Sequence, residues 1–262
     1  MSDRTNGGSR METIINQMNE EKEAKALEEM QKWKEENVIE YVENNDTVPY
    51  QWYSWGPPLC QFQITDEELD IVKKQIEKDE DGTNYAHQLA GAVETQTGFS
   101  DLTRYNIFNT IARYFYAYTR HAFLNHSVMA ETEEFNVNHI CQSLECSTMW
   151  VNHMVAGDYN PLHTHDDQMS FVLYTEVPEG LDAEIENSYN ESTRRVAPGA
   201  IEFRYGTSNI HPLSCIIKRS FPPKTGELFI FPNYLEHQVY PFKSEGVRTS
   251  ISGNLRYNRV YE

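Results

Sequence analysis

The second half of the chain carries seven short runs of β-forming residues, and this feature restricts the possible folds most strongly. The runs are rich in Val, Ile, Phe, Tyr and Thr and are bounded by Gly, Pro, Asn and Asp. No helical pattern is apparent between them, so they predict an antiparallel sandwich or jelly roll. In chain order after about residue 136 they are MWVNHMVA, MSFVLYTEV, AIEFRYG, CIIKRSF, ELFIFP, HQVYPF and RTSISGNLRY.

The first half of the chain is predicted to be mostly helical. The run LCQFQI predicts a short strand, and a capping box at Thr65–Glu68 then begins a helix that continues to about Lys78. A second helix with a wide apolar face is predicted from Ser100 to Phe123. We expect these helices to cover one sheet, which gives a mainly β fold with flanking helices.

Residues 1–45 are predicted to be a leader followed by an acidic amphipathic helix, and residues 46–262 to be one domain with its core at about 136–258. The helix, from Met11 to about Glu43, has a narrow apolar stripe among like charges. It is interpreted either as a solvated helix docked by one stripe or as a partner helix through which the chain forms a homo-oligomer.

The chain is strongly acidic, with 22 Lys+Arg against 40 Asp+Glu and a formal net charge of −18. Such a charge repels polyanions and therefore opposes nonspecific binding to nucleic acid or to anionic membranes. The sequence has no run of 18 apolar residues and no apolar signal-peptide core near its start. We therefore expect a cytoplasmic protein.

The four cysteines are Cys60, Cys141, Cys146 and Cys215, and they are interpreted as thiols. Cys141 and Cys146 lie near His139, but their spacing is not that of a zinc motif and there is no second pair. A zinc site there is the less favoured alternative.

The motif that carries chemistry is GDYNPLHTHDD, which contains an HxH (His163, His165) and an overlapping HxD (His165, Asp167). Residues i and i+2 of a strand project from the same face, so either pair aims two ligands at one point. His237 is the best candidate for a distant third ligand, because it follows the apolar run GELFIFP. Two histidines with a carboxylate suit a non-haem Fe(II) oxygenase, whereas three histidines suit a cupin-like or zinc site.

Arg248 lies eleven residues after His237, in the run RTSIS. Strand alternation places Arg248, Ser250 and Ser252 on one face. A guanidinium with a nearby hydroxyl suits a bidentate grip on a terminal carboxylate of a cosubstrate. The alternative is an ion pair between Arg248 and one of the 40 acidic residues.

With these motifs in place, the run from Trp150 to Asn254 resembles the 2-oxoglutarate- and Fe(II)-dependent oxygenases. It is most similar to their prolyl-hydroxylase-like group in bacteria and phages, which would place a phage-encoded chain in the host cytoplasm. GELFIFP to RTSIS is the most specific part of this resemblance. The resemblance implies a double-stranded β-helix, which is a cupin-like jelly roll, with iron at its mouth.

By position, the resemblance makes His237 the distal iron ligand and Arg248 the partner of the far carboxylate of 2-oxoglutarate. Tyr174 would be a second donor to that carboxylate, and three residues would line the cavity: Asn152, Ser250 and Asn254. Related prolyl hydroxylases have HxD where this group has HxH. The sequence therefore leaves open whether His163 or Asp167 completes the triad with His165.

The function that the resemblance implies is hydroxylation of a C–H bond with Fe(II) as cofactor and with 2-oxoglutarate and O2 as cosubstrates. The prime substrate is expected to be a peptidyl residue, proline by resemblance, or a small molecule. Two alternatives stand beside it: a cupin-type metal protein, such as an isomerase or dioxygenase, that does not use 2-oxoglutarate, and a noncatalytic binding protein.

Overall fold

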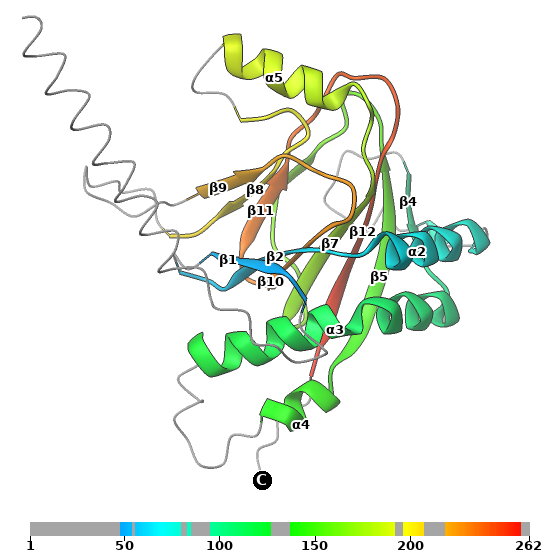
Figure 1. Ribbon diagram of the computed structural model, residues 1–262, viewed down its shortest axis with the longest axis vertical. Coiled ribbons are helices and arrows are strands. Elements are labelled where there is room, and N and C mark those ends of the chain that lie inside the picture. Colours follow the sequence, from blue (N-terminus) through cyan, green and yellow to red (C-terminus); the bar gives the residue numbers. More distant parts are fainter. Residues whose placement is uncertain are drawn as a thin grey trace, which may run out of the picture. The chain divides into compact units, whose positions relative to one another are not determined.

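Two antiparallel sheets form the body of the protein in the computed structural model (Figure 1). The structure describes residues 48–53, 56–79, 83–84, 95–126, 137–191, 196–206 and 218–257. These lie in the unit Val48–Glu262, so the helix predicted within residues 1–45 lies outside the described residues. None of the described helices is long and apolar enough to cross a membrane.

The larger sheet has eight strands and the smaller one has four. All strand pairs within the two sheets are antiparallel. In spatial order the larger sheet consists of β1 (Tyr50–Tyr53), β2 (Leu59–Gln63), β10 (Glu227–Pro232), β7 (Met169–Glu176), β12 (Arg248–Arg256), β5 (Glu145–Met154), β4 (Thr95–Gly98) and β3 (Thr83–Asn84). The smaller sheet consists of β6 (Asn160–His163), β11 (Glu236–Val239), β8 (Ile201–Arg204) and β9 (Lys218–Phe221).

The seven predicted runs all contain strands, which are β5, β7, β8, β9, β10, β11 and β12. The prediction of a mainly β jelly roll is therefore confirmed. The expectation that no helix interrupts these runs was wrong, because α5 (Leu181–Glu191) lies between β7 and β8. Helix α5 buries only Leu181 and Ile185, one turn apart, so its apolar pattern is too short to stand out in the sequence.

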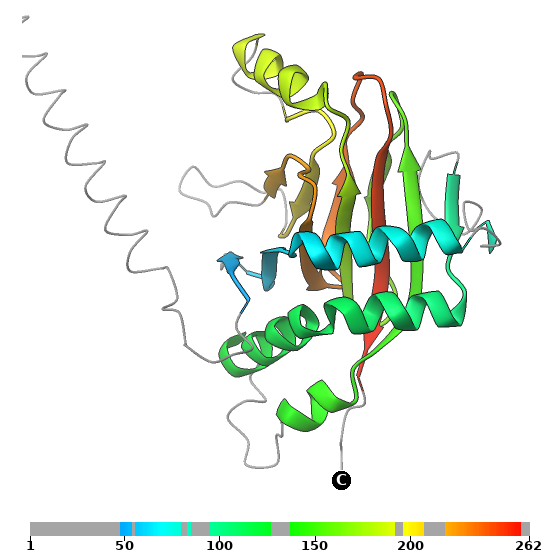
Figure 2. The same cartoon turned by 45° about the vertical axis from the view of Figure 1, so that its right-hand side comes forward.

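The two predicted helices of the first half are present as α2 (Asp66–Lys78) and α3 (Asp101–His126), and a short helix α4 (Val137–Gln142) was not predicted. The capping box of α2 is formed: the Glu68 N–H donates to Thr65 Oγ1 at 3.2 Å, and the Thr65 N–H donates to Glu68 Oε2 at 3.0 Å. Figure 2 shows α2 and α3 lying side by side across the larger sheet, as predicted.

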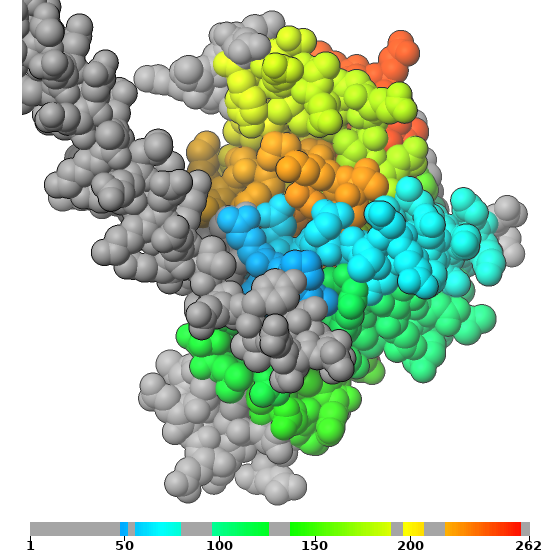
Figure 3. Space-filling view, viewed as in Figure 1, coloured from blue at the N-terminus to red at the C-terminus, as the bar shows by residue number. Residues whose placement is uncertain are grey.

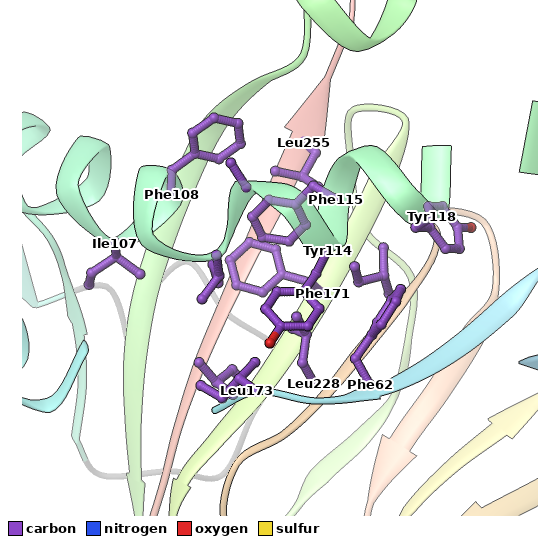
Figure 4. Close-up of a cluster of buried hydrophobic side chains, with 14 of the residues drawn as sticks. Phe62, Ile107, Phe108, Tyr114, Phe115, Tyr118, Phe171, Leu173, Leu228 and Leu255 are labelled. Carbon is purple, nitrogen blue, oxygen red and sulfur yellow. The ribbon is translucent and has the colours of Figure 1, made fainter. Parts of the chain in front are cut away.

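One hydrophobic cluster joins these helices to the larger sheet (Figure 4). Phe115 of α3 packs on Phe171 of β7 with ring centroids 4.9 Å apart, and Tyr114 meets Phe62 of β2 at 5.3 Å. Burial of these large rings accounts for the long apolar face predicted on α3. The helices therefore cover the face of the sheet that points away from the smaller sheet.

A second cluster fills the space between the two sheets. Phe229 and Phe231 of β10 pack there against Phe203 of β8, with ring centroids 6.0 and 4.9 Å apart.

In the space-filling view, α5, the β9–β10 segment, α2 and α3 follow one another down one side of the molecule (Figure 3). The rest of the space between the sheets forms the cavity described below.

Three of the cysteines are described, and all are free thiols. Burial raises the pKa of Cys146 to about 12, so this side chain stays protonated at neutral pH. No third ligand joins Cys141 and Cys146 among the described residues. Cys215 lies outside the described residues.

Candidate metal and carboxylate site

Three histidines from two neighbouring strands meet inside the protein. His163 ends β6 and pairs directly with His237 of β11, while His165 lies two residues beyond β6. One nitrogen of each ring lies within 4.8 Å of one nitrogen of each of the other two. Among the described residues, no other group of three or more His, Cys, Asp or Glu side chains brings its ligand atoms this close together. The HxH and the distant histidine of the sequence prediction are thus brought together.

The protons on two of these rings are fixed by the backbone. His163 Nδ1 lies 2.7 Å from the carbonyl oxygen of Pro161, and His237 Nδ1 lies 3.0 Å from that of Leu235. A carbonyl oxygen only accepts hydrogen bonds, so Nδ1 carries the proton in both rings and Nε2 keeps a lone pair. His165 Nε2 lies 3.1 Å from His237 Nε2. Two nitrogens bound at a right angle about 2.1 Å from one ion lie roughly 3 Å apart.

All three imidazoles are held neutral. Burial lowers the pKa of His165 to about 3, with a further contribution from His163. Burial likewise lowers the pKa of His163 and takes that of His237 well below its ordinary value. Neutral imidazole is the form that binds metal, and three such donors suit a divalent transition metal such as Fe(II). The donor set therefore admits the predicted Fe(II), and equally the zinc or cupin-type ion for which three histidines are typical.

Asp167 is not part of this cluster. Its backbone has a φ of 63°, and its carboxylate oxygen Oδ2 accepts a hydrogen bond from Ser147 Oγ of β5. Asp is one of the few residue types that adopt positive φ readily. Of the two ligands that the sequence left open, the geometry thus brings His163, and not Asp167, to the other histidines.

Asn233 holds the turn that carries His165. Its side-chain Nδ2 donates to the carbonyl oxygens of His165 at 3.3 Å and Asp167 at 2.8 Å. Its own carbonyl oxygen accepts from the His165 N–H at 3.1 Å. Asn233 was not predicted from the sequence, although it lies in the turn PNYLEH between the GELFIFP strand and His237.

The histidines open onto a cavity of about 360 Å³ between the two sheets. Its wall includes four alternate residues of β12, which confirms the predicted single face for Arg248, Ser250 and Ser252. The predicted lining residues Asn152 and Asn254 and the predicted carboxylate donor Tyr174 also lie in this wall. Ser250 pairs with Asn152 on one side and with Tyr174 on the other, so these three form a row across β5, β12 and β7.

Arg248 is buried in this cavity without a negative partner. Its side chain is 1% exposed, Nη1 donates to the carbonyl oxygen of Gly199, and Nη2 contacts Met154 Sδ. Nε has no partner, and no carboxylate of a described residue lies within ion-pair distance. Burial lowers the pKa of Arg248, which reflects the cost of an uncompensated charge. The alternative of an ion pair with an acidic side chain is not seen.

Tyr174 adds a second unsatisfied group beside Arg248. Its hydroxyl is buried and has no hydrogen-bond partner, and the Arg248 guanidinium carbon lies 5.9 Å from the centre of its ring. Burial raises the pKa of Tyr174 to about 12, so the hydroxyl is a neutral donor at physiological pH. Together the two side chains offer donors that suit a carboxylate.

Another part of the cavity wall is formed by uncharged amide and hydroxyl side chains. Gln96 of β4 donates from Nε2 to Asn152 Oδ1 at 2.7 Å, and Asn152 Nδ2 donates to Ser252 Oγ at 3.2 Å. The Trp150 ring, two residues before Asn152, lies 5.7 Å from that of His165. Strand alternation over MWVNHM places Trp150 beside Asn152, whereas Gln96 lies in TQTG, which carries no strand signal.

A comparison with protein families matches residues 148–254 to the family described as "Putative 2OG-Fe(II) oxygenase". This segment contains all of the candidate site residues described above except Gln96 and Ser147. No curated protein matches the chain.

Solved structures that resemble the chain include a Pseudomonas putida prolyl-4-hydroxylase, with 13% identity over 81% of this chain and 95% of that chain and a TM-score of 0.47. A viral collagen prolyl hydroxylase from Paramecium Bursaria Chlorella virus-1, in complex with 2OG, has 16% identity over 77% and 96%, with a TM-score of 0.43. A prolyl hydroxylase from Trichoplax adhaerens, in complex with a hypoxia inducible factor peptide fragment, has 10% identity over 78% and 84%, with a TM-score of 0.47.

Proposed function

We propose, from the match of residues 148–254 to the family described as "Putative 2OG-Fe(II) oxygenase", that this chain hydroxylates a C–H bond of a peptidyl residue, with proline as the first candidate. Enzymes of this family use 2-oxoglutarate and O2 as cosubstrates. A small-molecule prime substrate is the second candidate. The family match supports this function over the two alternatives, a cupin-type protein without 2-oxoglutarate and a noncatalytic binding protein.

In this proposal His163, His165 and His237 hold Fe(II) through their Nε2 atoms. When bound, Fe(II) supplies the activation of O2 that is coupled to oxidative decarboxylation of 2-oxoglutarate. The chain itself keeps the three imidazoles neutral and orients two of them, His163 and His237, through backbone carbonyl oxygens. Such backbone contacts to the second ring nitrogen are a general means of orienting metal ligands.

The observation that carries the proposal is the buried guanidinium of Arg248 in the same cavity as the three histidines. We assign to it the far carboxylate of 2-oxoglutarate, with the Tyr174 hydroxyl as a second donor. A charge-assisted bond to a carboxylate would compensate the charge that burial leaves unpaired. Ser250, between Tyr174 and Asn152 in the same row, lines the path towards the histidines.

Aromatic rings limit the access of water to the ligand His237. The Phe231 and Phe203 rings lie 4.8 and 5.9 Å from its ring centre, and the side chain is 4% exposed. Exclusion of water strengthens electrostatic interactions inside the site and limits side reactions. The role of the chain is thus to bind, to orient and to exclude solvent.

The test is an assay of succinate formed from 2-oxoglutarate with purified protein, Fe(II) and O2. Succinate should form only when all three are present, and a chelator should stop it. Addition of a blocked peptide that contains proline should raise the rate and yield a hydroxylated product, detected by a 16-dalton mass increase. Succinate formation that is unaffected by omission of Fe(II) would contradict the proposal. A peptide panel without effect would point to the small-molecule candidate.

A further inference from the structure

The cavity extends beyond the residues assigned to Fe(II) and 2-oxoglutarate. It reaches Gln96 on β4, which is separated from β12 by β5. Gln96 is 1% exposed and pairs in register with Asn152, so both amides project from the same face of the larger sheet. This part of the wall has no role in the function proposed above.

The Gln96 amide is satisfied on one side only. Its Nε2 donates to Asn152 at 2.7 Å, but its Oε1 is buried and accepts no hydrogen bond from a described residue. Nearly all buried polar atoms in proteins have a partner, and an acceptor that lacks one lowers stability. An orphaned acceptor in a cavity wall is therefore a position where a ligand can supply the missing donor.

A second orphaned acceptor comes from the opposite sheet. Asn160 of β6 pairs with Val239 of β11, and a register shift separates this pair from the pair His163–His237. The extra residue in β6 places Asn160 in the same cavity wall as His163, although the two are an odd number of positions apart, with only Pro161 and Leu162 between them. Asn160 Oδ1 is also buried and has no hydrogen-bond partner in the part of the chain that the structure describes.

The charges around this part of the cavity do not suit an anion. The cations in the described cavity wall are Arg248, assigned above to 2-oxoglutarate, and Arg104. Arg104 is already engaged, since it donates to the carbonyl oxygen of Ser147 at 2.8 Å and to Asp101 at 2.9 Å. Asp166 adds a further acceptor to the wall. The matching ligand group is therefore a hydrogen-bond donor.

We propose that Gln96 Oε1 and Asn160 Oδ1 form a subsite that binds N–H groups of an uncharged amide in the prime substrate. This inference rests on the proposed function and deepens it, because a peptide backbone is the substrate class that presents such groups. The two amides are positioning residues that select and orient the substrate beside the histidines.

The test uses three small probes on the full chain: N-methylacetamide, N,N-dimethylacetamide and acetate. The protein is labelled with ¹⁵N and loaded with Zn(II) and 2-oxoglutarate, and the side-chain NH₂ signals of Gln96 and Asn160 are followed by NMR. Each signal is assigned by its absence in Gln96→Met or Asn160→Leu protein. N-methylacetamide should shift both signals in a saturable manner. Its dissociation constant should be at least tenfold lower than that of N,N-dimethylacetamide, which lacks the N–H, and at least tenfold lower than that of acetate.

Matched variants separate binding from folding. Gln96→Met should weaken the binding of N-methylacetamide at least tenfold, as measured from the Asn160 side-chain signal. Gln96→Glu keeps an acceptor at this position and should therefore retain the binding of N-methylacetamide. Thr97→Val is the control, because Thr97 is the next residue of β4 and projects from the opposite face. If the affinities for the two amides differ by less than tenfold, or if N-methylacetamide shifts neither signal, the proposed subsite is wrong.

The outcome is distinguishable from failure of the proposed function. Binding of 2-oxoglutarate is measured calorimetrically on the same protein, and its absence would contradict the oxygenase assignment of Arg248. The amide titrations are then repeated on metal-free protein, where the Gln96 and Asn160 acceptors are present regardless of the ion. Amide binding with no 2-oxoglutarate binding would thus retain the subsite and reject the oxygenase assignment.

Discussion

Arg248 Nη1 donates a hydrogen bond to the carbonyl oxygen of Gly199, which lies in the segment leading into β8 of the opposite sheet. Gly199 has a φ of +69°, and a Cβ there would lie 3.2 Å from Leu181 Cδ2 and 3.5 Å from Arg248 Nη1. Glycine is the residue that adopts this conformation without strain. The guanidinium is therefore anchored across the gap between the two sheets while its Nε remains free.

Arg248→Ala should weaken 2-oxoglutarate binding at least tenfold. Loss of one partner of a buried charged pair typically costs about 2 to 5 kcal/mol, and about 1.4 kcal/mol corresponds to tenfold. Arg248→Lys should rescue affinity only partly, because a point charge does not reproduce the planar fork. Arg256→Ala is the control, since Arg256 is on the same strand but pairs with Glu145 at the surface. Titration of the absorbance of the Fe(II)–2-oxoglutarate complex measures these affinities, and equal values in all proteins would reject the assignment.

The ligand set is tested by single substitutions. His163→Ala, His165→Ala and His237→Ala should each abolish Mn(II) binding in calorimetry, because each removes one of three converging donors. Asp167→Asn should keep affinity within about threefold, since Asn retains the positive φ and the contact with Ser147. Circular dichroism checks that each variant is folded. Retention of metal by His163→Ala together with its loss in Asp167→Asn would replace the three-histidine set with the alternative that contains Asp167.

Asn233→Ala should lower metal affinity about 10-fold or more without removal of any ligand. Groups that orient metal ligands typically contribute 10- to 100-fold to affinity. Asn233 donates to the backbone of His165 and of Asp167, so its loss releases the turn that positions His165. Asn233→Asp should behave similarly, because a carboxylate does not donate. If both variants bind Mn(II) as tightly as the wild type, the turn is held by other contacts.

Glu202 gives the protein a pH dependence that is independent of the site. Burial tends to raise its pKa, but hydrogen bonds from Arg204 at 2.7 Å and Gln238 at 2.9 Å prevail and hold the pKa of Glu202 below its ordinary value. The stabilisation is thus fully present above the unfolded pKa of about 4.3 and is lost as pH falls through the lower folded value.

Glu202→Gln should therefore lower the free energy of unfolding by about 1.5 to 3 kcal/mol at pH 7, the range for hydrogen bonds to a charged group. The difference from the wild type should shrink as the pH falls below about 4. Urea denaturation at pH 7 and at pH 3.5 measures it. A difference that stays constant between the two pH values would show that the effect is one of packing and not of charge.

Features encoded in local patterns were predictable from the sequence. The capping box at Thr65 fixed the start of α2, and the alternation in RTSIS placed Arg248, Ser250 and Ser252 on one face. Both depend on residues within a few positions of each other. The position of His237 after the apolar run GELFIFP already made it the best candidate for the distant third ligand, and the resemblance to a known family then assigned it the role of distal iron ligand.

Features that depend on tertiary pairing were not predictable. The choice between His163 and Asp167 depends on the register of β6 against β11 and on the contact of Ser147 with Asp167, which lies 20 residues further along the chain. Gln96 enters the cavity only because β4 pairs with β5. Neither pairing leaves a periodic signal in the sequence.

The three histidines come from β6, the turn after it and β11 on the smaller sheet, while Arg248, Tyr174, Asn152 and Gln96 come from the larger one. The residues that would bind the ion thus lie on one sheet or in the turn after β6, and most of the residues that would bind ligands lie on the other sheet. Substitutions of Gln96 on β4 or Asn152 on β5 should therefore change what the cavity accepts while His163 and His237 keep their backbone contacts. Such a division allows the specificity of the protein to diverge in evolution without loss of its reactive centre.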